Sequence, residues 1–221
     1  MEILHFFTDF IVHVDDKLLE VISFFGNWTY FILFFIIFAE TGLIIFPFLP
    51  GDSLLFAIGA FSALGYCNIT VVLVSLFIAA VIGDSVNYWI GRKFGQKIVD
   101  NPKIPINQEH IDQTQAFYEK NGGKTIIIAR FIPIIRTFAP FVAGVSHMRY
   151  KDFMLFNVVG GFVWVFGFTL LGFFFGNLEE VKKNMEFAVL AVICLSLLPV
   201  LFEFVHVKFK KHKEVKYSEK N

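Results

Sequence analysis

The chain has 221 residues, no net charge, and a composition that is 56% hydrophobic and 18% aromatic. Its mean hydropathy of +0.66 excludes an ordinary water-soluble protein. Because the net charge is zero, no overall electric field attracts nucleic acid. Residues 71–90, 153–175 and 187–207 each form an apolar run of about 20 residues, the length that crosses a bilayer. The sequence therefore predicts an all-α membrane protein with several transmembrane helices.

The first predicted element is an N-terminal amphipathic helix over residues 1–27. Its Ile, Leu and Phe residues are mixed with acids and one lysine, which is typical of a helix that lies at the membrane interface. The acid Glu2 stands where a secretory signal carries basic residues, so we do not expect a cleaved leader.

Residues 28–92 are predicted to form a first repeat, in which a broken apolar hairpin precedes the full span over residues 71–90. Asp52 or Ser53 can cap the second, shorter helix of this hairpin. Residues 31–46 are nearly long enough to cross the membrane alone, which would move the N-terminus to the cytoplasm, so this alternative to a re-entrant hairpin stays open. Helix breakers separate the two helices of the hairpin: Pro47, Pro50 and Gly51.

Residues 93–124 form a polar stretch, which we expect to be a cytoplasmic loop and a helix. A second repeat is predicted over residues 125–176, with another broken hairpin and the full span over residues 153–175. A transmembrane helix over residues 185–207 and a basic cytoplasmic tail over residues 208–221 follow. The breakers of the second hairpin are Pro133, Pro140 and Gly144.

The basic residues indicate how these elements are oriented. Residues 92–124 and the C-terminal tail are both rich in lysine and arginine, which favours the cytoplasmic side for both. If residues 125–144 crossed the membrane, the loop and the tail would lie on opposite sides. We therefore expect residues 125–144 to enter and leave from the cytoplasm, and the first hairpin to enter from outside. Two opposed re-entrant hairpins, each followed by a span, predict an inverted-topology repeat.

Four charged residues lie inside the two broken hairpins: Glu40, Asp52, Arg130 and Arg136. Each charge costs about 2.5–3.5 kcal/mol at the centre of a bilayer on insertion scales. Backbone groups freed by a helix break persist at that depth only beside protein or water. We therefore expect the two acids to lie near the two arginines, in a wet cleft between the hairpins.

Two interpretations of this cleft stay open. In the first, the arginines bind a phosphate or carboxylate group, and the buried acids take up and release protons. In the second, the four charges form a structural ion-pair network that holds the hairpins together. We favour the first interpretation because charged residues flank prolines on both hairpins.

Asp84 and Asn87 lie one helical turn apart near the inner end of the first span. They either extend the polar path or are buried against Arg92 or another partner. The histidines show no ligand spacing, so we expect neither a metal site nor a cofactor. The tryptophans are expected to be interface anchors or packing residues: Trp28, Trp89 and Trp164.

The charged segments also carry the motifs of a known family. Glu40, Pro50-Gly51-Asp52 and the run from Arg130 to Arg136 closely resemble the bacterial DedA family, whose members carry the SNARE-associated or VTT domain. The resemblance covers residues 31–176. Further matching residues are Gly83, Asp84, Tyr88, Trp89, Ile90, Gly91, Arg92, Gly95, Ala143, Gly144, Gly160, Trp164, Gly172 and Gly176.

The resemblance implies an inverted-repeat transporter of the bacterial cytoplasmic membrane, not an enzyme, with Glu40 and Asp52 as essential acids and Arg130 and Arg136 as essential arginines. Members are associated with proton-dependent membrane physiology and with moving lipids, among them undecaprenyl phosphate and aminophospholipids. We therefore expect a proton-coupled transporter or flippase whose partners are anionic membrane lipids. The alternatives are a membrane enzyme that acts on lipid phosphates and a scaffold that transports nothing. Because members share these residues but differ in role, the motif does not identify the lipid.

Overall fold

The computed structural model of this chain describes residues 26–43, 51–99, 108–179 and 181. Several expected features lie outside these residues: nearly all of the N-terminal amphipathic helix, the breakers Pro47 and Pro50, the C-terminal transmembrane helix and the basic tail.

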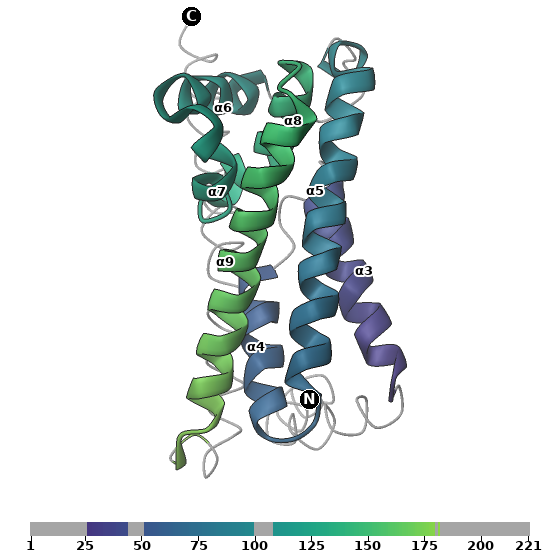
Figure 1. The fold of residues 1–221 in the computed structure, drawn as a ribbon, viewed down its shortest axis with the longest axis vertical. Helices are drawn as coiled ribbons and strands as arrows, with labels where there is room; N and C mark the ends of the chain where they lie inside the picture. Colours follow the sequence, from purple (N-terminus) through teal and green to yellow (C-terminus); the bar gives the residue numbers. More distant parts are fainter. Residues whose placement is uncertain (1–25, 44–50, 100–107, 180, 182–221) are drawn as a thin grey trace, which may run out of the picture.

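Within the described ranges the fold is built from helices, and no strand occurs in them. This architecture agrees with the expected all-α membrane protein. The elements in chain order are α3 (Trp28–Gly42), α4 (Gly51–Ala63), α5 (Ile69–Val99), α6 (Gln108–Asn121), the 3₁₀ turn η1 (Gly122–Lys124), α7 (Thr125–Ala129), α8 (Pro133–Val145) and α9 (Tyr150–Gly176) (Figure 1).

Two of these helices are long and apolar enough to cross a membrane. They are Ile69–Gly95 of α5 and the whole of α9, each with 27 residues, which corresponds to about 40 Å of helix. The helix α5 continues to Val99, beyond the end expected at Arg92, because the next proline comes only at position 102 and the packing of α8 against this part of α5 favours the helix. The other apolar helices are shorter, namely α3, α4 and Ile135–Val145 of α8.

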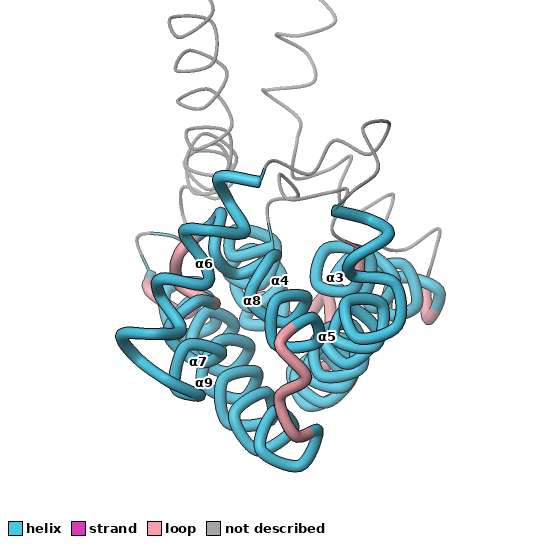
Figure 2. Tube along the Cα trace, turned by 90° about the horizontal axis from the view of Figure 1, so that it is seen from above, coloured by secondary structure: helices cyan, strands magenta, loops and turns pink. Residues whose placement is uncertain are grey.

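The shorter helices lie at opposite ends of the two long ones. In Figure 1, α3 and α4 accompany the lower parts of α5 and α9, whereas α6, α7 and α8 lie beside the upper parts. The last turn of α3, the first turn of α4 and the chain between α7 and α8 therefore all lie near the middle of the bundle. Seen from above, α3 and α5 lie on one side of the bundle, and α7 and α9 lie on the other (Figure 2).

The packing of the short helices alternates between the two long helices. The helix α3 packs on α5, which follows it in the chain, but α4 packs on α9. In the second half, α7 packs on α9, which follows it, but α8 packs on α5. Each long helix therefore carries one short helix from each half of the chain.

Two apolar cores lie on either side of the middle. The lower core joins α3, α4, α5 and α9 through residues such as Ile37, Leu55 and Leu76. The upper core includes Phe141 of α8 and Phe153 of α9, with partly buried residues from α5 and α6 packed around them. The charged residues of the broken hairpins lie between these two cores.

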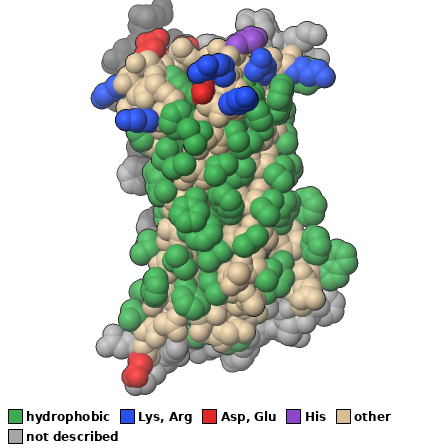
Figure 3. Space-filling view, viewed as in Figure 1, with side chains coloured by type: hydrophobic (Ala, Val, Ile, Leu, Met, Phe, Trp, Pro, Cys, Tyr) green, Lys and Arg blue, Asp and Glu red, His purple; other side chains and the backbone are tan. Residues whose placement is uncertain are grey.

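The kind of side chain on the surface also changes along the long axis of the bundle. Hydrophobic side chains cover the middle of the face drawn in Figure 3, and lysine and arginine gather at its upper end. We call this part of the surface the basic end. Its members are exposed side chains on α5, α6, η1 and α9 or directly beside them: Arg92, Lys93, Lys120, Lys124, Arg149 and Lys151.

Candidate functional site

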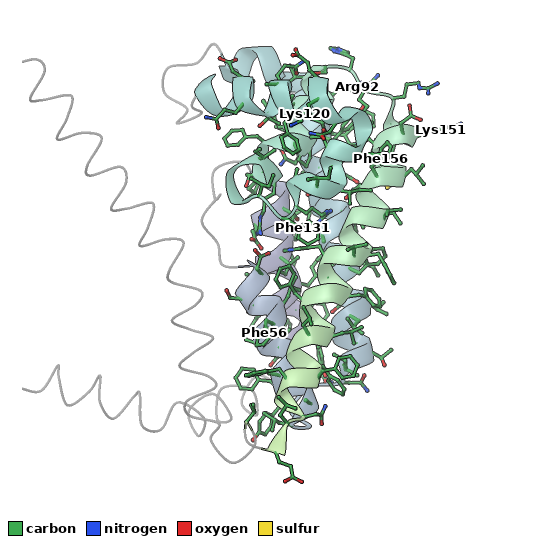
Figure 4. The ribbon with its side chains drawn as sticks, turned by 90° about the vertical axis from the view of Figure 1, so that its left-hand side faces the viewer. Phe56, Arg92, Lys120, Phe131, Lys151 and Phe156 are labelled. Atoms are coloured by element: carbon green, nitrogen blue, oxygen red, sulfur yellow. The ribbon has the colours of Figure 1, made fainter. Side chains whose placement is uncertain are left out.

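The candidate site lies where the two broken hairpins meet. Figure 4 shows Phe131, which follows Arg130 in the chain, at middle height, between the basic end with Arg92, Lys120 and Lys151 and the lower part with Phe56. At this level the last turn of α3, the first turn of α4 and the first turn of α8 come together. Each contributes one of the predicted charged residues.

Glu40 on α3 is almost completely buried, with 2% of its surface exposed. Its Oε1 accepts a hydrogen bond of 3.1 Å from the backbone nitrogen of Gly51, the first residue of α4. The free N–H groups and the helix dipole at this end of α4 favour a negative charge. Glycine at position 51 leaves room for this contact, because a Cβ atom there would displace the Glu40 carboxylate. The end of α3 is thereby joined to the start of α4.

Arg136 on α8 lies between both acids. Its guanidinium forms ion pairs with Glu40 and with Asp52, where the Nη1–Oδ1 distance is 2.9 Å. The indole Nε1 of Trp164 on α9 donates a hydrogen bond of 2.6 Å to the same Asp52 oxygen. The Arg136 guanidinium also lies over the Trp164 ring at 5.2 Å, within the range of a cation–π contact. Side chains from α3, α4, α8 and α9 thus form one polar cluster.

Arg130 forms a second cluster beside the first. This residue is the C-cap of α7, and its Nη2 donates to Asp84 Oδ2 on α5 at 2.5 Å and to Asn157 Oδ1 on α9 at 2.7 Å. Its guanidinium lies 5.5 Å from the ring of Trp164, so the indole contacts both arginines. The side chain of Arg130 fits beside α9 because Gly160 and Gly161 have no side chains there.

The structure brings together three of the four charged residues that were expected to meet: Glu40, Asp52 and Arg136. Arg130 pairs with neither expected acid, because Asp84 is its ionic partner. Arg92, the partner named for Asp84, instead donates to the Tyr88 hydroxyl at 2.7 Å.

Asn87, which was expected either to extend the polar path or to be buried against a partner, is fully buried. Its Nδ2 donates to the backbone oxygen of Thr41 at 3.2 Å and to that of Thr137 at 2.9 Å, so it joins α3, α5 and α8. Backbone oxygens that lack a partner at membrane depth need donors of this kind. Asn87 therefore closes backbone hydrogen bonds beside the charged clusters.

Two of the expected breakers lie inside a continuous helix, which corrects the prediction. The break falls between Arg130 and Pro133, where α8 begins, whereas Pro140 and Gly144 are both part of α8. A proline removes one backbone N–H, and such a loss is tolerated at membrane depth where neighbouring helices surround the helix. Two backbone oxygens just before the proline accept bonds from other helices: Tyr118 donates to the Ala139 oxygen at 2.9 Å, and Asn87 donates to the Thr137 oxygen at 2.9 Å. Gly144 allows α8 to approach the backbone of α5 at Tyr88.

Two residues of the site were not predicted from the sequence. Asn157 was not considered, although a single amide within an apolar span is itself a signal. Trp164 was expected to be an interface anchor or a packing residue, but only 1% of its surface is exposed and its ring contacts the charged clusters. Asn157 and Trp164 are seven residues apart and therefore share one face of α9. Trp28 and Trp89, in contrast, are 69% and 50% exposed.

The clusters enclose very little free space. The cavity between them has a volume of about 10 Å³, close to what one water molecule needs. Two buried polar atoms of its lining, Glu40 Oε2 and Arg130 Nε, have no hydrogen-bond partner. The site is therefore closed to a lipid headgroup in this structure. The lining residues are Glu40, Thr41, Asp84, Arg130, Arg136, Thr137 and Trp164.

The described residues include no group of three or more His, Cys, Asp or Glu side chains that could hold a metal ion. The charged groups of this site are two guanidinium groups and three carboxylates. Planar guanidinium groups bind phosphate and carboxylate with paired hydrogen bonds. A buried carboxylate accepts a proton when its positive partner is taken away.

Comparison with known proteins gives a consistent result. The model of the VTT domain matches residues 49–174. Protein DedA of Escherichia coli (strain K12) is 48% identical over 211 residues, which cover 94% of this chain and 96% of that protein. No solved structure shows a significant match.

Two further relatives cover slightly more than three quarters of the chain. An uncharacterized membrane protein of Mycobacterium tuberculosis is 43% identical over 175 residues, 78% of this chain and 77% of that protein. The inner membrane protein YqjA of Escherichia coli (strain K12) is 35% identical over 173 residues, with the same two coverages of 78% and 77%. The names of these relatives describe membrane proteins and carry no enzymatic activity.

Proposed function

The chain belongs to the DedA family of VTT-domain membrane proteins, and we propose that it moves an anionic lipid, undecaprenyl phosphate or a phospholipid, across the cytoplasmic membrane. The observation that carries this proposal is the position of Arg136. Its side chain is only 12% exposed and lies between Glu40 and Asp52, where the end of α3 and the starts of α4 and α8 meet. A charge is expensive at this depth, and such residues in membrane proteins usually belong to a transport path.

The cluster can exchange one of its own acids for a lipid phosphate. A phosphate group that approaches Arg136 replaces a carboxylate as the partner of the guanidinium, with the same paired hydrogen bonds. The Trp164 ring lies against both guanidinium groups and can support them during this exchange. The site therefore contains the groups that recognise an anionic headgroup without selecting its chemical details.

Coupling to protons follows from the same exchange. When a phosphate occupies Arg136, Glu40 and Asp52 lose their positive partner. Glu40 is almost fully buried, so its charged form is then costly and proton uptake compensates. When the lipid leaves, Arg136 returns to the acids and the proton is released. Binding of the anion and uptake of a proton are thereby linked.

We further propose that the two halves of the chain form an inverted repeat with opposed re-entrant hairpins. The alternating packing supports this arrangement, because α4 and α8 each pack on the long helix of the other half. The helices α3 and α7 approach the middle of the bundle from opposite ends (Figure 1). Such a site can open to either side of the membrane in turn.

The orientation that we propose places the basic end in the cytoplasm. Exposed lysine and arginine residues gather there, and cytoplasmic segments of membrane proteins carry an excess of these residues. With the expected final span, the C-terminal tail would lie on the same side.

A reconstituted transport assay tests the function. The full chain is placed in liposomes that contain a fluorescent anionic lipid, and its movement between leaflets is followed with and without a pH gradient. We expect transport by the natural protein and background rates for Arg136→Ala, with the extracted lipid chemically unchanged. Arg149→Ala removes an exposed arginine from the pair with Asp152 and should transport normally.

Two outcomes contradict the proposal. One is unchanged transport by an Arg136→Ala protein that inserts normally, and the other is chemical conversion of the lipid, which indicates an enzyme. Arg136→Lys separates transport from a scaffold role. A scaffold keeps its function because the lysine still pairs with Glu40 and Asp52, whereas a transporter loses activity because lysine lacks the paired hydrogen bonds to a phosphate.

A further inference from the structure

The helices of this bundle form two groups that are each held together closely. One group, which we call the α9 group, consists of α4, α7 and α9, and the α5 group consists of α3, α5 and α8. Within the α9 group, a Cβ atom at Gly172 would overlap the backbone oxygen of Phe56. Within the α5 group, a Cβ atom at Gly144 would overlap that of Tyr88. Backbones in such direct contact cannot slide past each other easily.

Each arginine of the site has one partner in its own group and one partner across the boundary. Arg136 belongs to the α5 group, pairs with Glu40 in that group, and reaches Asp52 in the α9 group. Arg130 belongs to the α9 group, where it bonds to Asn157, and it reaches Asp84 in the α5 group. The two ion pairs Arg136–Asp52 and Arg130–Asp84 therefore connect the groups.

The two arginines differ in what remains when the groups separate. Arg136 keeps the carboxylate of Glu40, whereas Arg130 keeps the neutral amide of Asn157 and the ring of Trp164 but no carboxylate. A buried guanidinium without a negative partner is costly, so Arg130 then needs an anion far more than Arg136 does. Arg130 also has a buried Nε without a hydrogen-bond acceptor, and both Arg130 and Asp84 line the central cavity.

We propose that Asp84 is a positioning residue of the transport site: it occupies Arg130 while the site is closed and releases it to the lipid phosphate when the two groups separate. The inference rests on the proposed function, because it requires an anionic lipid as the incoming partner. Asp84 is thus a competitor of the lipid. Its carboxylate keeps Arg130 in place between transport events and limits how tightly the phosphate can bind.

The test measures binding of a simple phosphate amphiphile to the full chain. Dodecyl phosphate is titrated into the protein in dodecyl maltoside micelles, and the shift of the unfolding temperature gives its affinity. In Asp84→Asn, the asparagine oxygen still accepts the bond from Arg130 but no longer competes as a charge. We expect dodecyl phosphate to bind about tenfold more tightly, which corresponds to about 1.4 kcal/mol. A residue that only stabilised the fold would not strengthen phosphate binding when changed.

A matched control makes the same exchange in an exposed ion pair. Asp152→Asn breaks the pair with Arg149 at the basic end and should leave the affinity unchanged. Asn157→Asp serves as a second variant, which should change the affinity for dodecyl phosphate in the opposite direction. It gives Arg130 a carboxylate within the α9 group. We expect dodecyl phosphate to bind several-fold more weakly to this variant, and it decides the question if Asp84→Asn does not fold.

The outcomes separate the inference from the function on which it rests. If the natural protein binds dodecyl phosphate but folded Asp84→Asn binds it no more tightly, the inference about Asp84 is wrong and the proposed function stands. Unchanged binding by folded Asn157→Asp likewise contradicts the inference alone. If the natural protein does not bind dodecyl phosphate at all, phosphate recognition by this site is wrong and the inference is overturned together with it.

Discussion

Trp164 connects the two arginines of the site. Its ring lies 5.2 Å from the Arg136 guanidinium and 5.5 Å from that of Arg130, and its N–H donates to Asp52. The side chain is buried at the level where Asp52 is still 40% exposed. A large aromatic ring at this point excludes lipid from the charges and fixes the position of the Asp52 carboxylate. A substitution can separate what the ring of Trp164 and what its hydrogen bond contribute to stability and transport.

Trp164→Phe keeps an aromatic ring and removes the N–H. We expect the free energy of unfolding to fall by about 1–2 kcal/mol, because Asp52 loses a charge-assisted hydrogen bond and the smaller ring leaves space. Transport should fall as well, since Asp52 is no longer held toward Arg136. Unfolding by SDS in mixed micelles measures the first effect, and the liposome assay measures the second.

Trp28→Phe is the control for this change, because Trp28 is 69% exposed on α3. Its effect on the free energy of unfolding should stay within about 0.5 kcal/mol. Equal losses for the two substitutions would show that the N–H of Trp164 adds nothing to stability.

At the scale of the helices, glycine determines which elements can touch. Gly59 and Gly172 bring α4 and α9 into backbone contact, and Gly91 and Gly144 do the same for α5 and α8. Helices in a membrane gain little from the hydrophobic effect, so close packing and hydrogen bonds have to hold them together. The packing of α4 on α9 and of α8 on α5 depends on these contacts.

Gly172→Ala tests this dependence. Alanine favours a helix over glycine by about 1 kcal/mol, but here its methyl group would overlap the Phe56 carbonyl, so we expect a net loss of about 1–3 kcal/mol. Gly167 lies on the same helix with no atom near its missing side chain. Gly167→Ala should therefore be neutral or slightly stabilising. Thermal unfolding in detergent compares the two, and equal effects would contradict the packing argument.

For the whole molecule, the division into an α5 group and an α9 group predicts which cross-links block transport. Phe77 on α5 and Phe162 on α9 contact each other, with ring centroids 6.3 Å apart, so cysteines at both positions can be joined by a short reducible linker. In a protein with Cys67→Ala and Cys194→Ala, oxidative linking of Phe77→Cys/Phe162→Cys by a short bis-thiosulfonate reagent should abolish transport. Reduction should restore it, since only the covalent link prevents the groups from separating.

The matching control links two helices of one group. A Cβ at Gly95 lies 3.5 Å from Val145 Cβ, within the range of disulfides, and both residues belong to the α5 group. Oxidised Gly95→Cys/Val145→Cys should still transport. Loss of transport in both oxidised proteins would contradict a movement between these two groups.

The orientation of the whole molecule can be tested by labelling single cysteines in the same background. Ser146→Cys lies at the basic end and Leu178→Cys at the opposite end, and both positions are exposed. With the basic end in the cytoplasm, a membrane-impermeant maleimide should label Leu178→Cys in intact cells and Ser146→Cys only after permeabilisation. The reverse pattern would show that the basic end faces outward.

Much of the architecture could be predicted from local properties of the chain. The long apolar runs predicted the two helices of the described residues that can cross the membrane, since a span is recognised by its length and hydropathy alone. The helix over 108–121 and the short helices around the breaks also follow from local signals. Pro140 was misjudged, because α8 is packed against α5 and α6, and local signals do not show this packing.

The sequence by itself also determined which residue types had to find partners, because Glu40, Asp52, Arg130 and Arg136 are too costly to face lipid. Only the tertiary structure decided the pairing. Arg136 contacts both predicted acids, whereas Arg130 contacts Asp84 and Asn157, which approach it from two long helices. Hydropathy and helix breaks are properties of neighbouring residues, but the choice among several possible ion pairs depends on which helix backbones touch. In this protein the glycine contacts between distant helices make that choice.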